Sequence, residues 1–188
     1  GSSAASDVYK RQLKLSPINF FRGAREAMLV AFSTSSSAAT LPVSMSAAED
    51  NLGVKPVVAS TVLPLGATIN MDGTALYVGI VSVFAAQAFG IDLTLTDYLI
   101  MAGTTTLVSV GTAAVPSASL FLMAAVMETI GMTAQQIAVT VGFIFIIDRP
   151  LDMLRTSINI AGDLAVSTAV ATWEGEFDRE VFDRPLNS

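Results

Sequence analysis

Near its C-terminal end the chain reads Asp148-Arg149-Pro150-Leu151-Asp152-Met153-Leu154-Arg155-Thr156-Ser157-Ile158-Asn159-Ile160-Ala161-Gly162-Asp163. Polar side chains recur here at intervals of four, three, four and four residues, at Asp148, Asp152, Arg155, Asn159 and Asp163. At about 100° per residue, a helix gathers these five side chains within roughly 80° of arc. The rest of the helix is mainly apolar, which reverses the pattern of a helix on the surface of a soluble protein. We therefore predict that this polar stripe faces protein, ligand or ions.

The composition favours a membrane setting. Hydrophobic residues make up 52% of the 188 residues and charged residues only 14%, whereas soluble domains carry about 25% charged residues. Between Pro56 and Ile91 the only formal charge is Asp72, and none occurs from Tyr98 to Met127 or from Thr129 to Ile147. The sequence therefore predicts an all-α protein that is integral to a lipid bilayer.

The absence of two residue types excludes several chemistries. With no Cys and no His, the chain can form neither thiolate or imidazole metal sites nor disulfides, and it lacks the parts of a Cys–His or Ser–His–Asp catalytic group. The net charge of −6 argues against nucleic acid as a partner. We expect no organic cofactor.

Both ends of the chain differ from its middle. Residues 1–12 are Ser-rich, lack an initiator Met and lack the apolar core of a secretion signal, so we interpret them as a disordered cloning or assembly remnant. The apolar pattern is already established near Leu13, and we expect an N-terminal portion to be missing. Residues 13–174 are predicted to form the folded core, and residues 175–188 an acidic tail in water.

The core is predicted to consist of helices with interruptions. A first hairpin is expected at about 17–50 with a serine tip, a helix at about 56–90 is broken at Asn70–Gly73, a second hairpin is expected at about 98–130, and a last helix at about 133–171. The arms are shorter than the roughly 20 apolar residues of a membrane span, which favours re-entrant hairpins. Irregular backbone at membrane depth lies within protein or lines a cavity, so we expect both tips and the break to converge on one site.

Four motifs in this order carry a resemblance to a known family: Ser35-Ser36-Ser37-Ala38-Ala39-Thr40-Leu41-Pro42, Asn70-Met71-Asp72-Gly73-Thr74, Ser109-Val110-Gly111-Thr112 with Val115-Pro116, and Asp152-Met153-Leu154-Arg155-Thr156 with Asn159 and Gly162-Asp163. Over about Ser16 to Glu174 the chain resembles the glutamate/aspartate sodium symporters, the dicarboxylate/amino acid:cation symporter family. The resemblance implies the C-terminal transport core of a sodium-coupled transporter of L-aspartate or L-glutamate, not an enzyme. It further implies a scaffold in the missing N-terminal half, a homotrimeric full-length protein, and a place in the plasma membrane or a bacterial inner membrane.

The resemblance implies a set of substrate-binding residues. It assigns the substrate side-chain carboxylate to Arg155, the α-ammonium to Asp152 and the α-carboxylate to Asn159. The enclosing residues that it implies are Ser36, Ser37, Thr74, Val115 and Thr156. The residue chemistry is independently suited to these roles, because arginine presents a planar fork of donors that matches a carboxylate. Asp152 supplies the opposite charge for an ammonium, so an acidic amino acid is preferred over a plain dicarboxylate.

Bound sodium ions are expected as coupling ions, because the carboxylates of the stripe and Asp72 outnumber the nearby cations. Hard cations prefer carboxylate and carbonyl oxygens. The resemblance implies one sodium at Asp163 with carbonyls of Gly66, Asn70 and Asn159, and another near Thr68, Ser109 and Thr112. A third near Asn70 and Asp72 would need residues of the missing half. We also predict that the second hairpin, at Ser109–Ser119, is the gate that shuts after cation and substrate bind.

Several positions depart from the family pattern. Arginines that relatives carry near the site are replaced here by Ser35 and Met153, and we expect Arg149, one turn before Met153, to substitute for them. In proton-coupled relatives a Glu follows the tyrosine of the broken helix, whereas here Val78 follows Tyr77, which favours sodium coupling. Pro150 is expected to kink the last helix near Ile146.

Other functions remain open at this point. A proton-coupled glutamate or dicarboxylate symporter of the same family is one alternative. An intramembrane aspartyl protease could use two of Asp72, Asp148 and Asp163 as a proton-sharing dyad, although Ile160 stands where the first Gly of a Gly-x-Gly-Asp signature belongs. A structural membrane helical bundle is a third.

Overall fold

The computed structural model describes residues 13–184, which fold as an all-helical assembly, as predicted. Within this range the β pairing is confined to one isolated antiparallel bridge between Val54 and Phe177. Residues 1–12, interpreted above as a cloning or assembly remnant, lie outside the described range. So do residues 185–188, the last four of the predicted acidic tail. The elements are α2 Pro17–Thr34, α3 Ser37–Ser46, the π-helical turn η2 Ala47–Asn51, α4 Pro56–Ile69, α5 Asp72–Ala88, α6 Leu95–Val110, α7 Ser119–Thr129, α8 Ala134–Glu174 and α9 Arg179–Asp183.

Helices α2 and α3 form the first hairpin with a two-residue serine tip. Helix α2 starts at Pro17 and is capped by the Ser16 hydroxyl, which accepts a hydrogen bond from the backbone N–H of Asn19. It ends where Ser35 adopts a left-handed conformation, with φ of 51°. Ser36 then caps α3 by accepting from the N–H of Ala39. The serine run thus closes one helix and opens the next, because serine caps helices better than it extends them.

Helices α4 and α5 are the two halves of the predicted broken helix. Asn70 and Met71 have non-helical backbone angles (φ −92°, ψ 74° and φ −109°, ψ 55°), so the helix stops at Ile69 and restarts at Asp72. The Asp72 carboxylate lies in the first turn of α5, where the helix dipole favours a negative charge. Taken as one segment, Pro56–Ala88 is long and apolar enough to cross a membrane by length and composition, and it is the one such candidate among residues 13–184.

Helices α6 and α7 form the second hairpin, whose tip is longer than that of the first. Helix α6 begins with a capping box in which Thr94 and Asp97 satisfy each other's backbone N–H groups. It ends at Val110, and residues 111–118 form a non-helical tip before α7 starts at Ser119. In this tip Ser117 has φ of 58°, a left-handed conformation that is uncommon for a residue with a side chain.

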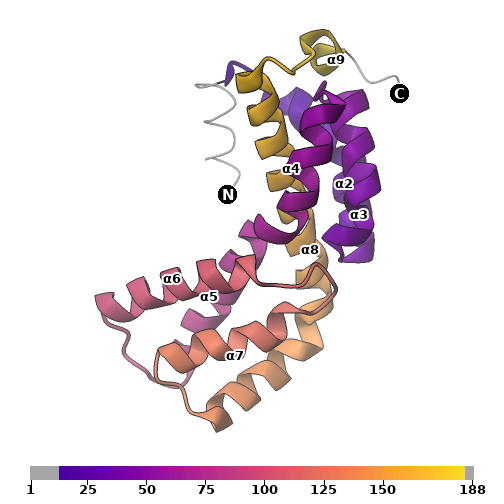
Figure 1. Cartoon of the computed structure of the whole chain (residues 1–188). Helices are drawn as coiled ribbons and strands as arrows, with labels where there is room; N and C mark the ends of the chain where they lie inside the picture. Colours follow the sequence, from indigo (N-terminus) through magenta and orange to yellow (C-terminus); the bar gives the residue numbers. More distant parts are fainter. Residues whose placement is uncertain (1–12, 185–188) are drawn as a thin grey trace.

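Helix α8 connects the two halves of the molecule (Figure 1). It runs obliquely beside α7 and then upward beside α2 and α4, and it remains helical through Pro150. Pro150 lacks the N–H that would bond to the carbonyl of Ile146, which is the reason to expect a kink there. The kink near Ile146 remains a prediction. The helix ends three residues later than expected, at Glu174, where Gly175 turns left-handed with φ of 75°.

Two hydrophobic cores flank the middle of α8 and differ in composition. The first lies between α2, α3, α4 and the C-terminal half of α8 and is rich in small residues, including Ala24, Ala27, Ala31, Ala48 and Ala59. The second lies between α5, α6, α7 and the N-terminal half of α8 and contains Met101, Met123, Met127 and Met132. The hairpin tips and the α4–α5 break meet between the two cores (Figure 1).

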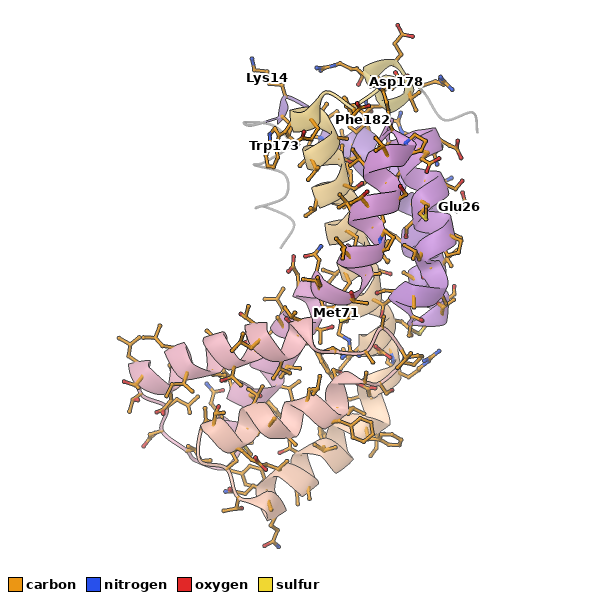
Figure 2. All side chains as sticks on the ribbon, viewed as in Figure 1. Lys14, Glu26, Met71, Trp173, Asp178 and Phe182 are labelled. Carbon is orange, nitrogen blue, oxygen red and sulfur yellow. The ribbon has the colours of Figure 1, made fainter. Side chains whose placement is uncertain are left out.

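The segment after α8 folds back as a clasp, which we define as residues 175–184. The N–H of Lys55 donates to the carbonyl of Glu176, and the N–H of Asp178 donates to the carbonyl of Gly53. Phe182 is 2% exposed and belongs to the first core, with Asp178 and Lys14 at the same end of the molecule (Figure 2). The clasp therefore packs against the core, although most of its charged side chains are exposed as a tail in water would require.

Candidate functional site

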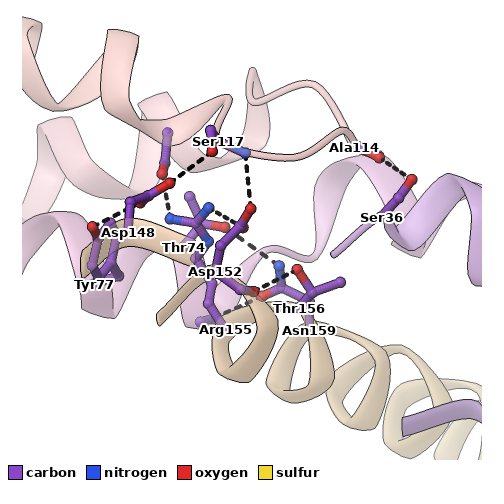
Figure 3. Close-up of polar contacts among 12 residues, drawn as sticks. Ser36, Thr74, Tyr77, Ala114, Ser117, Asp148, Asp152, Arg155, Thr156 and Asn159 are labelled. Carbon is purple, nitrogen blue, oxygen red and sulfur yellow. Dashed lines mark hydrogen bonds and ion pairs between the residues drawn. The ribbon is translucent and has the colours of Figure 1, made fainter. Parts of the chain in front are cut away.

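The polar stripe of α8 is buried within protein, as its spacing predicted. Its exposed fractions are 2% for Asp148, 1% for Asp152, 6% for Arg155, 4% for Asn159 and 2% for Asp163. Burial of charged groups is costly unless they are paired and hydrogen-bonded. The partners of Asp148, Asp152, Arg155 and Asn159 come from α5 and hairpin 2 (Figure 3), and the partner of Asp163 comes from the α4–α5 break.

Arg155 is paired on both sides of its guanidinium. One terminal nitrogen donates to the carboxylate of Asp152 and the other donates to the hydroxyl of Ser119. The guanidinium carbon lies 4.7 Å from the centre of the Tyr77 ring, within the range of a cation–π contact. Helix α5, hairpin 2 and α8 thus all contribute to holding one cation.

Asp152 and Asp148 both bond to Ser117 in the second hairpin tip. The backbone N–H of Ser117 donates to Asp152 at 2.8 Å, and its hydroxyl donates to Asp148 at 2.7 Å. The hydroxyl of Tyr77 also donates to Asp148, at 3.0 Å. The two carboxylates are therefore satisfied by donors from hairpin 2 and α5, together with Arg155.

Asn159 fixes the start of α5. Its amide oxygen accepts from the N–H of Gly73 at 2.8 Å, and its amide nitrogen lies 3.3 Å from the hydroxyl of Thr74. A side chain at Gly73 would not fit, because its Cβ would lie 2.6 Å from the carbonyl oxygen of Arg155. The hydroxyl of Thr156 donates within α8 to the carbonyl of Asp152, at 2.8 Å.

The two hairpin tips touch each other. The hydroxyl of Ser36 donates to the carbonyl of Ala114 at 2.8 Å, which links hairpin 1 to hairpin 2 above the stripe (Figure 3). Ser37 is buried beside this contact, whereas the Val115 side chain is 54% exposed. Ser35 is buried too, and within the described chain its hydroxyl has no hydrogen-bond partner.

A small cavity of about 20 Å³ lies between these groups. Seven of the eight predicted substrate residues line it: Ser37, Thr74, Val115, Asp152, Arg155, Thr156 and Asn159. Ser36, the eighth, lies in the tip contact next to it. A cavity needs about 10–15 Å³ of such volume to hold one water, so this cavity has room for about one water and not for an amino acid.

The predicted cation residues fall into two groups. At the α4–α5 break, the Asn70 amide donates to Asp163 at 3.0 Å, and Gly66 lies so close that a Cβ there would be 2.7 Å from the same carboxylate oxygen. Asp72 lies near the same group, because Gly162 of α8 faces both Asp72 and Asn70. A Cβ added to Gly162 would lie 3.6 Å from the Asp72 carboxylate and 3.0 Å from the Asn70 amide.

The second group is less concentrated. Ser109 and Thr112 are buried in hairpin 2, where their hydroxyls donate to the carbonyls of Thr106 and Val108. Thr68 is exposed at the end of α4, and its hydroxyl donates to Leu65. Across residues 13–184 no three acidic side chains cluster as metal ligands would. Thr68, Ser109 and Thr112 carry no carboxylate, so a cation at this second group would depend on hydroxyl and backbone carbonyl oxygens.

Sequence reasoning missed Tyr77, Ser117 and Ser119 as site residues and did not give Asp148 a role in the site. Tyr77 follows Thr74 by three positions, which places it on the same face of α5, so helical spacing could have indicated it. The serines required knowledge of how the tip folds back onto α8. Arg149 is exposed and forms no ion pair within the described range, so the structure gives no support to its expected role as a substitute arginine.

The geometry excludes one of the three carboxylate pairs that a protease could use, Asp148 with Asp163. Asp148 and Asp163 are fifteen residues apart on one helix, which at a rise of 1.5 Å per residue separates them by about 22 Å. Carboxylates that share a proton must lie within hydrogen-bonding distance of each other. Asp148 and Asp163 therefore cannot form a dyad, and Asp163 instead accepts from the Asn70 amide.

Comparison with known proteins gives similarity along most of the chain. The model of the sodium:dicarboxylate symporter family matches residues 8–173. An excitatory amino acid transporter of Caenorhabditis elegans is 40% identical over 171 residues, which cover 91% of this chain and 33% of that protein. Excitatory amino acid transporter 2 of Mus musculus is 41% identical over 156 residues, which cover 83% of this chain and 27% of that protein. The chain thus spans about a quarter to a third of the length of these relatives.

Proposed function

Because the chain belongs to the sodium:dicarboxylate symporter family, we propose that it is the substrate-carrying core of a sodium-coupled symporter of L-aspartate or L-glutamate. The observation that carries this proposal is the buried pair of Arg155 and Asp152, which lines a cavity between the two hairpin tips. One fixed cation and one fixed anion side by side complement a ligand that carries both charges, an amino acid with an acidic side chain.

The charge pair also separates substrate classes. A plain dicarboxylate would leave Asp152 facing an anion, and a neutral amino acid would leave Arg155 without its carboxylate. Breaking a buried ion pair costs about 3–5 kcal/mol, which corresponds to roughly two to three and a half powers of ten in affinity. Acidic amino acids are therefore the preferred substrates over both classes.

In the proposed complex Arg155 binds the side-chain carboxylate, Asp152 the ammonium and Asn159 the α-carboxylate. Thr74 and Thr156 lie beside these groups, and the serine tip closes the site from hairpin 1. The amide of Asn159 already bonds the start of α5, so substrate binding and the position of the α4–α5 break are coupled through one side chain.

Sodium ions would bind at the break and beneath hairpin 2. Asp163 is buried with the Asn70 amide as its hydrogen-bond donor, and an added cation would offset its charge. Gly66, which has no Cβ to hold the carboxylate away, allows the α4 backbone to approach it. Thr68, Ser109 and Thr112 would contribute the second site, and Asp72 the third with residues from outside this chain.

The surface supports insertion into a membrane. Exposed apolar side chains are spread over both hairpins, both halves of the broken helix and α8. Leu95, Leu107 and Phe121 of hairpin 2 and Ile146 of α8 are each more than three-quarters exposed. Large exposed apolar surfaces mark contact with lipid or other protein. We propose that the hairpins are re-entrant, that the plasma membrane or a bacterial inner membrane is the location, and that an N-terminal scaffold of a homotrimer covers part of this surface.

Hairpin 2 is the element proposed to admit the substrate. The cavity is too small for an amino acid, so one tip must move. The tip of hairpin 2 is the longer, and its arms pack in the methionine-containing core, whose flexible side chains adapt to altered packing more easily than the alanine-rich core of hairpin 1.

Calorimetric titration of the full-length protein that carries this segment tests the proposed function. We expect L-aspartate or L-glutamate to bind only when sodium is present, succinate to bind at least about a hundredfold more weakly, and Arg155→Ala to abolish binding. Sodium-independent binding that follows pH instead would favour the proton-coupled alternative. Equal affinities for succinate and aspartate would refute the assignment of Asp152.

A further inference from the structure

Two serines of hairpin 2 form the polar contacts that the substrate is proposed to form. The N–H of Ser117 donates to Asp152, the carboxylate assigned to the substrate ammonium. The hydroxyl of Ser119 accepts from Arg155, the guanidinium assigned to the substrate carboxylate. Both charged partners are thereby satisfied by groups of the hairpin itself.

We propose that Ser117 and Ser119 act as an internal competitor for substrate, so that the contacts of these two residues set how tightly the protein binds its amino acid. This inference rests on the proposed function for the identity of the substrate, but the contacts are those of the hairpin itself. When substrate enters, its ammonium and carboxylate replace one donor and one acceptor that the hairpin tip supplied.

The backbone of Ser117 supports this interpretation. Its φ of 58° is a left-handed conformation that glycine adopts more easily than serine. The position nevertheless carries a hydroxyl, and this hydroxyl donates to Asp148 at 2.7 Å while the N–H of the same residue donates to Asp152. A single residue in an unfavourable conformation therefore connects the tip to two buried carboxylates.

The contact between Ser119 and Arg155 also connects hairpin 2 to a buried charge of α8. Ser119 is 0% exposed at the first position of α7, so its bond to Arg155 is shielded from water. A hydrogen bond to a charged group contributes enough free energy to shift an equilibrium about tenfold or more. Loss of either serine contact should destabilise the closed position of the tip on α8 without removing any group assigned to the substrate.

The test uses a thiol placed behind the tips. The chain contains no Cys, and Ser35 is 2% exposed, lines the cavity and has a hydroxyl without a partner in the described residues. Ser35→Cys is thus nearly isosteric, and in a full-length protein whose other cysteines are replaced, its alkylation rate reports how often hairpin 2 opens.

Two variants are compared in this background. Ser119→Ala removes the contact with Arg155. Ser117→Gly removes the hydroxyl that anchors the tip to Asp148, while it keeps the N–H that donates to Asp152 and tolerates the left-handed turn. Thr106→Ala is the matched control, because its hydroxyl lies in the same hairpin but donates to Ala102 of its own helix. We expect both variants to raise the alkylation rate in the absence of substrate by about tenfold and to lower the Kd for L-aspartate by a similar factor.

The outcomes separate this inference from the proposed function. Unchanged alkylation rates in both variants would overturn it, and so would weaker aspartate binding, because the serines would then be substrate ligands. Protection of the thiol by L-aspartate in the background protein supports the proposed function whatever the variants do. If no acidic amino acid slows alkylation of the Ser35→Cys thiol, the proposed function fails. The alkylation rates of the two serine variants without substrate still decide the role of the serines. Should Ser117→Gly not fold, Ser119→Ala decides alone.

Discussion

At the scale of single residues, Asp148 shows how the site depends on groups that touch no proposed ligand. It accepts from Tyr77 and from Ser117, and the Tyr77 ring in turn lies against the Arg155 guanidinium. Asp148 therefore positions the face of the ring that stabilises the cation, and it does so from the same helix as Arg155. Asp148, Asp152 and Arg155 thus form one connected network with Tyr77 and Ser117, whereas Asn159 and Asp163 bond to the start of α5 and the α4–α5 break.

Gly66 permits the first prediction at this scale. A Cβ at this position would lie 2.7 Å from the Asp163 carboxylate oxygen and 3.0 Å from its carbon, so Gly66→Ala would push the carboxylate away from α4. Changes that displace a metal ligand typically reduce metal affinity about 10- to 100-fold. We expect the sodium concentration needed for half-maximal aspartate binding to rise by about tenfold.

The matched control for this prediction is Gly142→Ala in α8, where no atom lies within 4 Å of the added Cβ. Titration of sodium at fixed L-aspartate, followed by calorimetry, compares the two variants. If Gly66→Ala and Gly142→Ala show the same sodium dependence, Asp163 does not hold the ion as proposed.

At the scale of elements, the sequence predicted where helices stop better than how the connections between them fold. Asn70 and Met71 break the helix as the Asn-Met-Asp-Gly sequence indicated, and the serine run closes hairpin 1. These interruptions follow from local preferences for caps and turns. The end of α8 was placed three residues early, because the apolar pattern ends before Gly175 supplies the left-handed stop.

What local preference could not supply is the contact between segments distant in the sequence. The bond from Ser36 to Ala114 joins residues 78 positions apart, and that from Ser117 to Asp152 joins residues 35 apart. Spacing along α8 predicted the shared face of its charged residues. It contained no information on which hydroxyl of the second tip would meet them, so Ser117 and Ser119 were missed.

The contact between the clasp and Gly53 leads to a prediction about stability. Gly53 has φ of +69°, and a Cβ there would lie 2.1 Å from the carbonyl oxygen of Asp178. Gly53→Ala therefore combines a strained conformation with a backbone clash, and we expect it to lower the free energy of unfolding by about 2–4 kcal/mol.

Gly90→Ala is the control for the clasp, because Gly90 has the same φ of +69° with no atom within 4 Å of an added Cβ. It should cost only the conformational term of about 1–2 kcal/mol. Thermal unfolding of both variants in the same detergent measures the difference. Equal melting temperatures would show that the contact between Gly53 and Asp178 adds nothing to stability.

At the scale of the whole molecule, each half pairs one hairpin with one half-helix. Hairpin 1 lies with α4 on the alanine-rich core and hairpin 2 lies with α5 on the methionine-containing core, while α8 passes through both (Figure 1). The charged site lies at the junction of the two halves, and its charged residues belong to neither hydrophobic core. A relative movement of the halves, or of one tip, therefore alters the site while both cores remain packed.

This arrangement leads to the last prediction, that joining the tips covalently stops exchange. Ser36→Cys with Ala114→Cys replaces a 2.8 Å hydrogen bond between the tips with a candidate disulfide, which requires Cα atoms about 4.4–6.8 Å apart. Oxidation should abolish exchange of labelled L-aspartate in proteoliposomes, since an amino acid cannot enter a cavity of about 20 Å³, and reduction should restore it. Each single-cysteine variant, oxidised in the same way, controls for loss of the Ser36 hydroxyl. Exchange that persists at full cross-linking would mean that substrate reaches Arg155 without separation of the tips, and hairpin 2 would then not be the gate.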